Sequence, residues 1–470
     1  MSIQLIKKAS QTEPQNHKEK PRKISAAMIL AVIAAVLLIG RAPAQGDAVD
    51  CAFNPSVDAL LSQSNMGTWL HWVEVLSGEQ PAELDGFPYW IRTRNTRYLF
   101  DGSPDARGYD YVLLQVKNWF PDEAIIEQSF DYVELDAKNI ILTLPGSTKP
   151  DEYVLLIAHL DDTSWNSTSG RIAPGANDNA IGAATLLEAA RLFRQMQFER
   201  SIRLIWFTGE EAGTIGSRAY VAEYGDLDYR GVINLDMFGW DGDDDRCFEM
   251  HVGSLVESDE IGSCMAETIT SYSHDLKYDY FIKGATSRSD HINFWWNDIG
   301  AVAVSENFSE TGTENGCVGA DMNPYYHMME DTIDLNLTPD FSYEIARAAL
   351  ETIASLAVPV TTKPNPTAPT LSILELQPDW VSLKWTSVPH AETYRVFRSS
   401  FGCQHWGVKV AETEVSTWMD EGIRDEWPFQ YRIEAVFNDG IRVSQPSNCE
   451  SIGPEPPPIY PTIYFPVISR

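Results

Sequence analysis

Three short apolar stretches of this sequence are each followed at once by side chains that can bind a metal ion or exchange a proton. The stretches are residues 153–158, 202–208 and 231–235. The side chains that follow them are, in chain order, His159, Asp161, Glu210, Glu211 and Asp236. If the stretches are neighbouring parallel strands of an α/β sheet, their carboxyl ends face one crevice, and these side chains converge although they are far apart in the sequence.

Two more donors stand in loops that can point into the same crevice. Asp178 lies in a glycine-bearing loop at residues 174–179, just before an expected helix, and His327 lies in the loop at residues 324–327. With three of the strand-end donors they supply two imidazoles and three carboxylates. This set suits a pair of zinc ions that share one carboxylate, because zinc favours nitrogen and oxygen ligands and leaves a position for water in catalytic sites.

Two further acids are expected to support the histidines. Asp161 lies on the same side of the extended chain as His159, so its carboxylate can accept the second ring N–H of that histidine and fix the tautomer that binds metal. Asp331 follows His327 closely enough to do something similar there.

The acidic pair Glu210 and Glu211 offers two different roles. One carboxylate can coordinate metal while the other stays unligated beside a bound water molecule as the general base. The chain contains no His-Glu-x-x-His segment and no Gly-x-Ser-x-Gly segment, so helix-borne zinc proteolysis and serine-elbow hydrolysis lack their usual motifs. A two-metal route to hydrolysis therefore remains.

The elements that must position these residues follow an α/β pattern between about residues 55 and 358. Apolar, β-branched runs alternate there with longer amphipathic stretches, which predicts a sheet layered with helices. The expected strands are residues 139–144, 153–158, 202–208, 231–235 and 301–305. The expected helices are residues 179–196, 260–273, 290–296 and 339–356.

Six short motifs occur in a fixed order along residues 57–358. They are residues 158–161, 174–179 with 182, 209–211 with 216–217, 234–237, 289–291, and 326–327 with 330–331. As a set they resemble the secreted co-catalytic, di-zinc aminopeptidases of the bacterial leucyl aminopeptidase and aminopeptidase Y type. The resemblance implies a three-layer α/β/α zinc-exopeptidase domain with a mostly parallel mixed sheet.

The resemblance also implies a role for each candidate residue. It implies five ligands for two zinc ions per chain: Asp178, which bridges, His159 and Asp236 for one ion, and Glu211 and His327 for the other. Glu210 matches the position of the general base. Asn177 stands where acidic residues are common in such enzymes, but Asp178 itself is present. The loop at residues 317–325 matches no pocket pattern, so the preferred N-terminal residue stays open.

The expected reaction is release of N-terminal amino acids from peptides or proteins. A secreted, metal-dependent aminopeptidase would use a water molecule activated by two zinc ions, with Glu210 as the general base. Zinc glutaminyl cyclases have a similar fold and keep similar acidic residues and histidines. Cyclisation of N-terminal glutamine is therefore one alternative. A non-catalytic binding module on the same scaffold is another, although such proteins typically lose ligands that are all present here.

The net charge limits the classes of binding partner, and the cysteines indicate the cellular compartment. The chain has 67 Asp and Glu against 35 Lys and Arg, a formal net charge of −32, which would repel phosphate backbones and makes nucleic acid a poor partner. Six cysteines suit disulfides in an exported protein, and Cys403 is expected to pair with Cys449. Three pairings stay open for the other four cysteines, namely Cys51, Cys247, Cys264 and Cys317.

The N-terminus has the features of a secretory signal. Residues 24–40 are apolar, follow a basic stretch and precede small residues at positions 42–44. We therefore expect a signal peptide at residues 1–44 and a secreted or extracellular protein. A retained membrane anchor is the alternative, because the apolar run is near the lower limit for crossing a bilayer. A short segment at residues 45–56 then leads into the zinc peptidase domain at residues 57–358.

A second domain is expected after a proline-rich linker at residues 359–366. Alternating runs at residues 381–385, 393–397 and 430–436 predict a small all-β sandwich over residues 367–452, which resembles a fibronectin type III module. We expect it to act as a spacer or as an adhesive unit that contacts a cell surface or matrix, outside the active site. The tail at residues 453–470 is rich in proline and aromatic residues and is interpreted as an extended tail, or as an export or surface-attachment signal.

Overall fold

The computed structural model describes residues 50–84, 87–169, 171–309, 317, 319–360, 367–403, 405–423, 428–437 and 440–453. The expected signal peptide, residues 361–366 of the expected linker and the tail beyond residue 453 lie outside this part. Within the described ranges, no helix is both long enough and apolar enough to cross a membrane.

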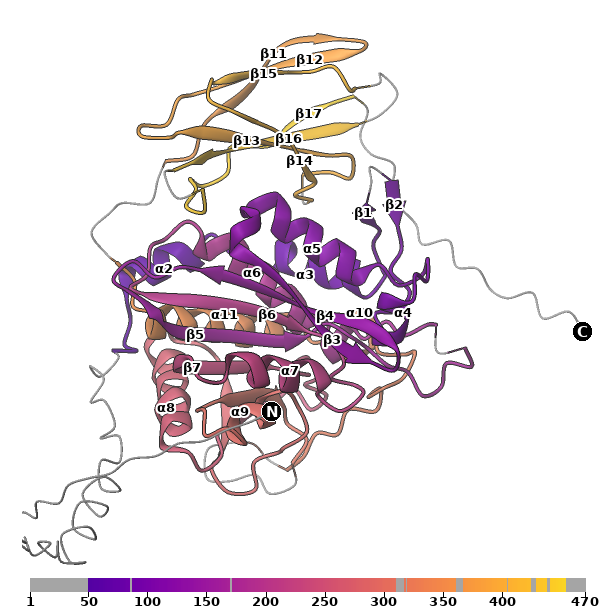
Figure 1. Ribbon diagram of the computed structural model, residues 1–470, viewed down its shortest axis with the longest axis vertical. Helices are drawn as coiled ribbons and strands as arrows, with labels where there is room; N and C mark the ends of the chain where they lie inside the picture. Colours follow the sequence, from indigo (N-terminus) through magenta and orange to yellow (C-terminus); the bar gives the residue numbers. More distant parts are fainter. Residues whose placement is uncertain are drawn as a thin grey trace, which may run out of the picture. The chain divides into compact units, whose positions relative to one another are not determined.

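A mixed sheet, with eight strands among the described residues, positions the candidate side chains (Figure 1). Its order is β3-β4-β6-β5-β7-β10-β8-β9. The strands are β3 (Ile125–Tyr132), β4 (Leu135–Leu144), β5 (Lys149–His159), β6 (Arg200–Phe207), β7 (Asp228–Leu235), β8 (Cys247–His251), β9 (Lys277–Phe281) and β10 (Val302–Glu306). The neighbours β6, β5, β7 and β10 run parallel, as do β8 and β9, whereas β3, β4 and β6 pair antiparallel, as do β10 and β8. The expected mixed α/β sheet is confirmed.

Helices cover both faces of the central strands (Figure 1). They include α3 (Met66–Leu76), α5 (Gly108–Trp119), α6 (Ile181–Phe193) and α11 (Pro339–Ala357) on one face, and α7 (Ile215–Tyr224) and α9 (His291–Trp295) on the other. Successive side chains of a strand point to opposite faces. Accordingly, Val154 and Leu156 of β5 pack in the hydrophobic core on the face covered by α3, α5, α6 and α11. Leu155 and Ile157 pack in the core on the face covered by α7 and α9. All eight residues of β6 are buried.

The parallel register brings the ends of three strands to one edge of the sheet. His159, the last residue of β5, pairs with Phe207, the last of β6, and Ile157 pairs with Asn234 near the end of β7. The loops that follow β5, β6 and β7 therefore leave the sheet side by side. These are the loops for which the sequence predicts metal donors.

The strands and helices expected in the α/β part are all present, with boundaries shifted by a few residues. The helix expected from residue 179 begins as α6 only at Ile181, after a distorted turn at Ala176–Ala180. Asp178 and Asn179 have non-helical backbone angles there. The Asn179 side chain instead donates to the carbonyl of Leu235 at 2.8 Å and accepts from the N–H of Gly182 at 3.0 Å, so it joins the start of α6 to the end of β7.

Several elements were not expected from the sequence. They include α3, α5, β3, β8 and β9, and the shorter α2 (Pro55–Leu61), α4 (Thr96–Phe100), α10 (Ile333–Asn336), β1 (Ala82–Leu84) and β2 (Phe87–Tyr89). The disulfides select one of the three pairings that the sequence left open. The disulfide Cys51–Cys264 ties the segment before α2 to α8 (Val256–Ser271), and Cys247–Cys317 ties the start of β8 to a distant loop. The expected pair Cys403–Cys449 is confirmed.

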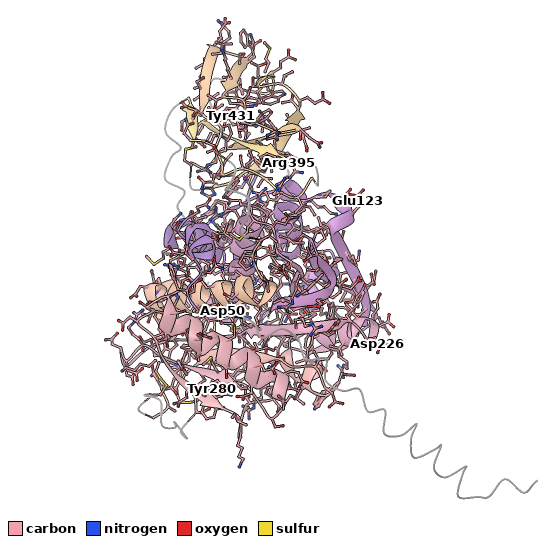
Figure 2. The ribbon with its side chains drawn as sticks, turned by 90° about the vertical axis from the view of Figure 1, so that its left-hand side faces the viewer. Asp50, Glu123, Asp226, Tyr280, Arg395 and Tyr431 are labelled. Atoms are coloured by element: carbon pink, nitrogen blue, oxygen red, sulfur yellow. A yellow bond between two sulfur atoms is a disulfide. The ribbon has the colours of Figure 1, made fainter. Side chains whose placement is uncertain are left out.

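Two antiparallel sheets with a shared core form the C-terminal part. Their orders are β11-β12-β15 and β14-β13-β16-β17. The strands are β11 (Leu371–Gln377), β12 (Trp380–Trp385), β13 (Thr393–Ser399), β14 (Val408–Thr413), β15 (Thr417–Asp420), β16 (Phe429–Val436) and β17 (Glu450–Ile452). Trp385, Tyr394 and Tyr431, the last labelled in Figure 2, pack between them in a separate hydrophobic cluster. The expected small all-β sandwich is confirmed.

The sandwich packs directly against the α/β part, within one compact unit. Arg194, which follows α6, donates two hydrogen bonds to Glu434 of β16 at 2.6 and 2.7 Å, and both side chains are almost completely buried. Arg395 of β13, labelled in Figure 2, donates to the carbonyl of Trp119 at 2.5 Å. The sandwich is therefore held to the α/β part by side-chain contacts as well as by the linker, which differs from the expected spacer.

Candidate active site

Five of the predicted side chains form one cluster where β5, β6 and β7 end. Their potential ligand atoms fall into two groups, and within each group the atoms lie within 4.8 Å of one another. The groups are His159, Asp178 and Asp236, and Asp178, Glu211 and His327. Asp178 belongs to both groups, as a bridging carboxylate must.

The two oxygens of Asp178 face two different imidazoles. Oδ1 lies 3.3 Å from Nε2 of His159, and Oδ2 lies 3.0 Å from Nε2 of His327. Nε2 of His159 also lies 3.1 Å from Asp236 Oδ1, and Nε2 of His327 lies 3.0 Å from Glu211 Oε2. Nε2 of each histidine thus faces two carboxylates. Ligand atoms that surround one cation are arranged in this way.

The electrostatics of the cluster fit bound dications. Burial, together with the charge of Asp178, raises the pKa of Glu211 to about 8. Burial would by itself lower the pKa of His327, but its contacts with Asp178 and Glu211 raise it to about 10. Among the described residues, no hydrogen-bond partner reaches Oε1 of Glu211 or Nδ1 of His327. Zinc would offset this concentration of buried carboxylates, and its preference for nitrogen and oxygen ligands matches the donor set.

Glu210 lies beside this cluster without belonging to either group around Asp178. Its carboxylate, a ring nitrogen of His159 and a carboxylate oxygen of Glu211 lie within 4.8 Å of one another. Burial raises the pKa of Glu210 well above its ordinary value, with the neighbouring Asp236 adding to the effect. A buried carboxylate with a raised pKa beside a cluster of potential metal ligands is suited to accept and return a proton.

Asp161 supports the cluster differently from the prediction. The nearest acceptor for Nδ1 of His159 is the main-chain carbonyl of Asp161 at 3.0 Å, whereas the carboxylate is 3.8 Å away. The carboxylate, which is fully buried, instead accepts the N–H groups of Glu210 at 3.2 Å and Glu211 at 3.3 Å. Asp161 therefore orients the histidine through its main chain and the acidic pair through its side chain.

The chain is similar to several known proteins. Residues 139–353 match the model of Peptidase family M28. A probable leucine aminopeptidase of Trichophyton verrucosum is 25% identical over 278 residues, which cover 56% of this chain and 70% of that protein. Aminopeptidase YwaD of Bacillus subtilis is 27% identical over 224 residues, 45% of this chain and 44% of that protein, so the match spans less than half of its length.

A solved structure shares the fold of the α/β part. The LapA aminopeptidase of Legionella pneumophila aligns with a TM-score of 0.52 and 20% identity, over 67% of this chain and 77% of that chain. The family match and the names of the relatives confirm the expected enzyme class, a zinc metallo-exopeptidase.

Asp331 holds the loop that carries Asp178. Its two carboxylate oxygens accept the main-chain N–H groups of Asn177 at 2.9 Å and Asp178 at 3.0 Å, and Asn336 donates to it at 2.7 Å. The predicted contact with the ring of His327 is not made, because both oxygens of Asp331 are occupied by these donors.

Glu306 is a supporting residue that the sequence reasoning missed. This buried acid accepts a hydrogen bond from Asn177 at 2.6 Å and one from the N–H of Trp240 at 3.2 Å, while Asn177 also accepts from the N–H of Gly239 at 2.8 Å. The network joins the Asp178 loop to the loop after β7. A signal was present, because Glu306 directly follows the apolar run at residues 301–305 as the other donors follow theirs.

Proposed function

We propose that this chain is a secreted aminopeptidase that removes N-terminal amino acids from peptides. It would bind two zinc ions through the five clustered side chains, His159, Asp178, Glu211, Asp236 and His327. The observation that carries the proposal is the pair of Asp178 contacts, one oxygen on each of two imidazoles, at 3.3 and 3.0 Å. The aminopeptidase names of the M28 relatives support the choice of reaction.

The residues divide the chemistry between them. Two bound zinc ions would supply Lewis acidity and lower the pKa of water toward 7. Glu210 takes the proton of the attacking water and then returns it to the leaving amine. Asp161 holds the main chain of Glu210 in place for both transfers. The net negative charge of the chain favours the approach of a cationic N-terminus over long range.

Export and the nature of the C-terminal module are part of the same proposal. The three disulfides suit an oxidising compartment, which supports a signal peptide at residues 1–44. The two facing antiparallel sheets support a fibronectin type III-like module at residues 367–452 that contacts a surface or matrix.

The test combines metal analysis with two product assays on the purified chain. We expect two zinc ions per chain, release of free amino acid from a peptide with a free N-terminus, and no release from the N-acetylated peptide. Removal of zinc with a chelator should abolish hydrolysis, and added zinc should restore it. One zinc ion with ammonia release from an N-terminal glutamine peptide would instead indicate a glutaminyl cyclase, and zinc binding without either product would indicate a binding module.

Replacing Asn166 with alanine should loosen the loop that carries His327. The Asn166 side chain accepts from the N–H of Met329 at 2.8 Å and donates to Glu330 at 2.7 Å. The adjacent N–H of Trp165 donates to the carbonyl of His327 at 2.8 Å. Because supporting contacts orient metal ligands, we expect Asn166→Ala to weaken zinc binding by roughly tenfold, as measured by competition with a chromogenic chelator.

Asn448→Ala is a matched control for this variant. The Asn448 side chain also makes two hydrogen bonds between separate segments, to the N–H and the carbonyl of Leu371, but it does so in the sandwich. It should leave zinc binding unchanged. Equal zinc affinities of the Asn166 and Asn448 variants would contradict a role for Asn166 at the metal site.

A further inference from the structure

A short buried segment at residues 93–96 runs behind the candidate site, outside the region that matches the family model. We call it the bracing segment. Thr93, Arg94 and Thr96 are almost completely inaccessible to solvent, and Thr96 begins α4. Hydrogen bonds from this segment reach the loops after β5 and β6 and the loop that carries Asp178. These three loops hold Asp178, Glu210 and Glu211, three of the six residues assigned to catalysis or metal binding, and the loop after β5 begins directly after a fourth, His159.

Arg94 joins two of these loops through their main chains. Its Nε donates to the carbonyl of Leu160, and its two terminal nitrogens donate to those of Pro174 and Gly175, each at 2.8 Å. Leu160 directly follows His159, and Gly175 lies three residues before Asp178. Because the guanidinium is planar and its donors are fixed relative to one another, these bonds set the distance between the two loops.

Asp162 compensates the buried charge of Arg94 and aligns the bracing segment with the end of β5. Its carboxylate accepts the N–H of Arg94 at 2.7 Å and the hydroxyl of Thr93 at 2.9 Å, and it lies 3.4 Å from the guanidinium. A buried ion pair tolerates burial only when such additional hydrogen bonds are made. The bracing segment is therefore held in one register beside Asp161.

Thr96 makes the connection between the loop after β5 and the loop after β6. Its hydroxyl donates to Oδ2 of Asp161 at 2.8 Å and accepts the N–H of Gly209 at 2.8 Å. Asp161 in turn accepts the N–H groups of Glu210 and Glu211. One hydroxyl, which can donate and accept at the same time, thus closes a ring of hydrogen bonds around the turn that carries both glutamates.

We propose that Thr96 is a positioning residue for Glu210 and Glu211. By fixing the turn at residues 209–211 against Asp161, its hydroxyl keeps the base beside the metal cluster and keeps the Glu211 carboxylate within reach of His327. The inference rests on the proposed function, but it concerns a residue that touches neither the substrate nor a metal ion.

The test compares Thr96→Val with Thr96→Ser in the full-length protein. Valine has nearly the shape of threonine but leaves the N–H of Gly209 without its acceptor and removes one of the two donors to Oδ2 of Asp161. We expect Thr96→Val to lower kcat by roughly 10- to 100-fold and zinc affinity by a similar factor, with KM nearly unchanged. Thr96→Ser, which keeps the hydroxyl, should restore kcat and zinc affinity to within about threefold of the original protein. Zinc affinity is measured by chelator competition, independently of activity.

Thr352→Val controls for the loss of a buried threonine hydroxyl elsewhere. Thr352 is fully buried in α11 and donates to the carbonyl of Ala348 at 2.7 Å, so its replacement should lower the thermal midpoint without changing kcat or zinc affinity.

If Thr96→Val does not fold, Thr96→Ala is judged by the same measurements. A folded Thr96 variant without the hydroxyl that keeps the original kcat and zinc affinity would overturn the inference. An original protein that neither binds zinc nor releases amino acids would instead overturn the proposed function.

Discussion

Glu210→Gln is expected to lower kcat by roughly 10²- to 10⁴-fold while KM and zinc content stay nearly unchanged. Glutamine has almost the same shape as glutamate, but its neutral amide cannot take the proton of the attacking water. Glu210 belongs to neither of the two donor groups that share Asp178, so the metal site should survive the substitution. The measurement is kcat and KM on a peptide with a free N-terminus, with zinc per chain determined on the same preparation.

Two companion variants separate loss of the base from other causes. Glu123→Gln changes an exposed carboxylate outside the cluster, labelled in Figure 2, and should leave kcat and zinc content unchanged. Glu211→Gln removes a proposed ligand and should lose zinc and activity together. A Glu210→Gln protein that binds zinc normally and keeps kcat within about tenfold of the original would remove Glu210 from the role of base.

The candidate cluster was predictable because the chain places its donors where strand patterns stop. His159, Glu210 and Asp236 each follow an apolar run, and parallel strands bring their carboxyl ends to one edge. The continuous apolar runs, together with their β-branched residues, were enough to predict β5, β6 and β7. The resemblance to known zinc aminopeptidases then assigned roles that residue types alone left open, such as the choice between Glu210 and Glu211.

The supporting contacts could not be predicted in the same way, because they depend on main-chain groups and on distant segments. The sequence indicates that Asp161 can reach His159, but it does not tell whether the carbonyl or the carboxylate does so. Thr96 lies 113 residues from Gly209 along the chain and belongs to no recognisable motif. Only the tertiary structure shows that one threonine hydroxyl connects two active-site loops.

The interface between the α/β part and the sandwich was missed for a related reason. Arginine and glutamate are almost never fully buried unless they are paired, so Arg194 at the end of a helix and Glu434 in an alternating strand are expected at the surface. The proline-rich composition of residues 359–366 also favours a separable module. Neither the residue types nor the linker composition can show that two charged residues 240 positions apart form a buried ion pair.

Glu434→Gln is therefore expected to lower the free energy of unfolding by about 3 to 5 kcal/mol. The guanidinium of Arg194 is fully buried, with the rings of Trp119 and Trp406 at 5.3 and 5.7 Å. Burial, with the nearby charge of Arg395 adding to the effect, lowers the pKa of Arg194 to about 10 although Glu434 opposes the shift. Without the carboxylate, the positive charge would stay buried and uncompensated. Urea unfolding followed by tryptophan fluorescence measures the loss.

Glu412→Gln is the matched control in the same module. Glu412 pairs with Arg395 at 3.3 Å, but about a third of its side chain is exposed, so this change should cost less than about 1 kcal/mol.

The double variant Arg194→Met with Glu434→Leu removes both buried charges and should recover most of the stability that Glu434→Gln loses, because a buried ion pair can be replaced by apolar residues of similar volume. If Glu434→Gln were no more destabilising than Glu412→Gln, the buried pair would not be what fixes the sandwich to the peptidase domain. If the double variant were as unstable as the single one, the loss would reflect disturbed packing and not an unpaired charge.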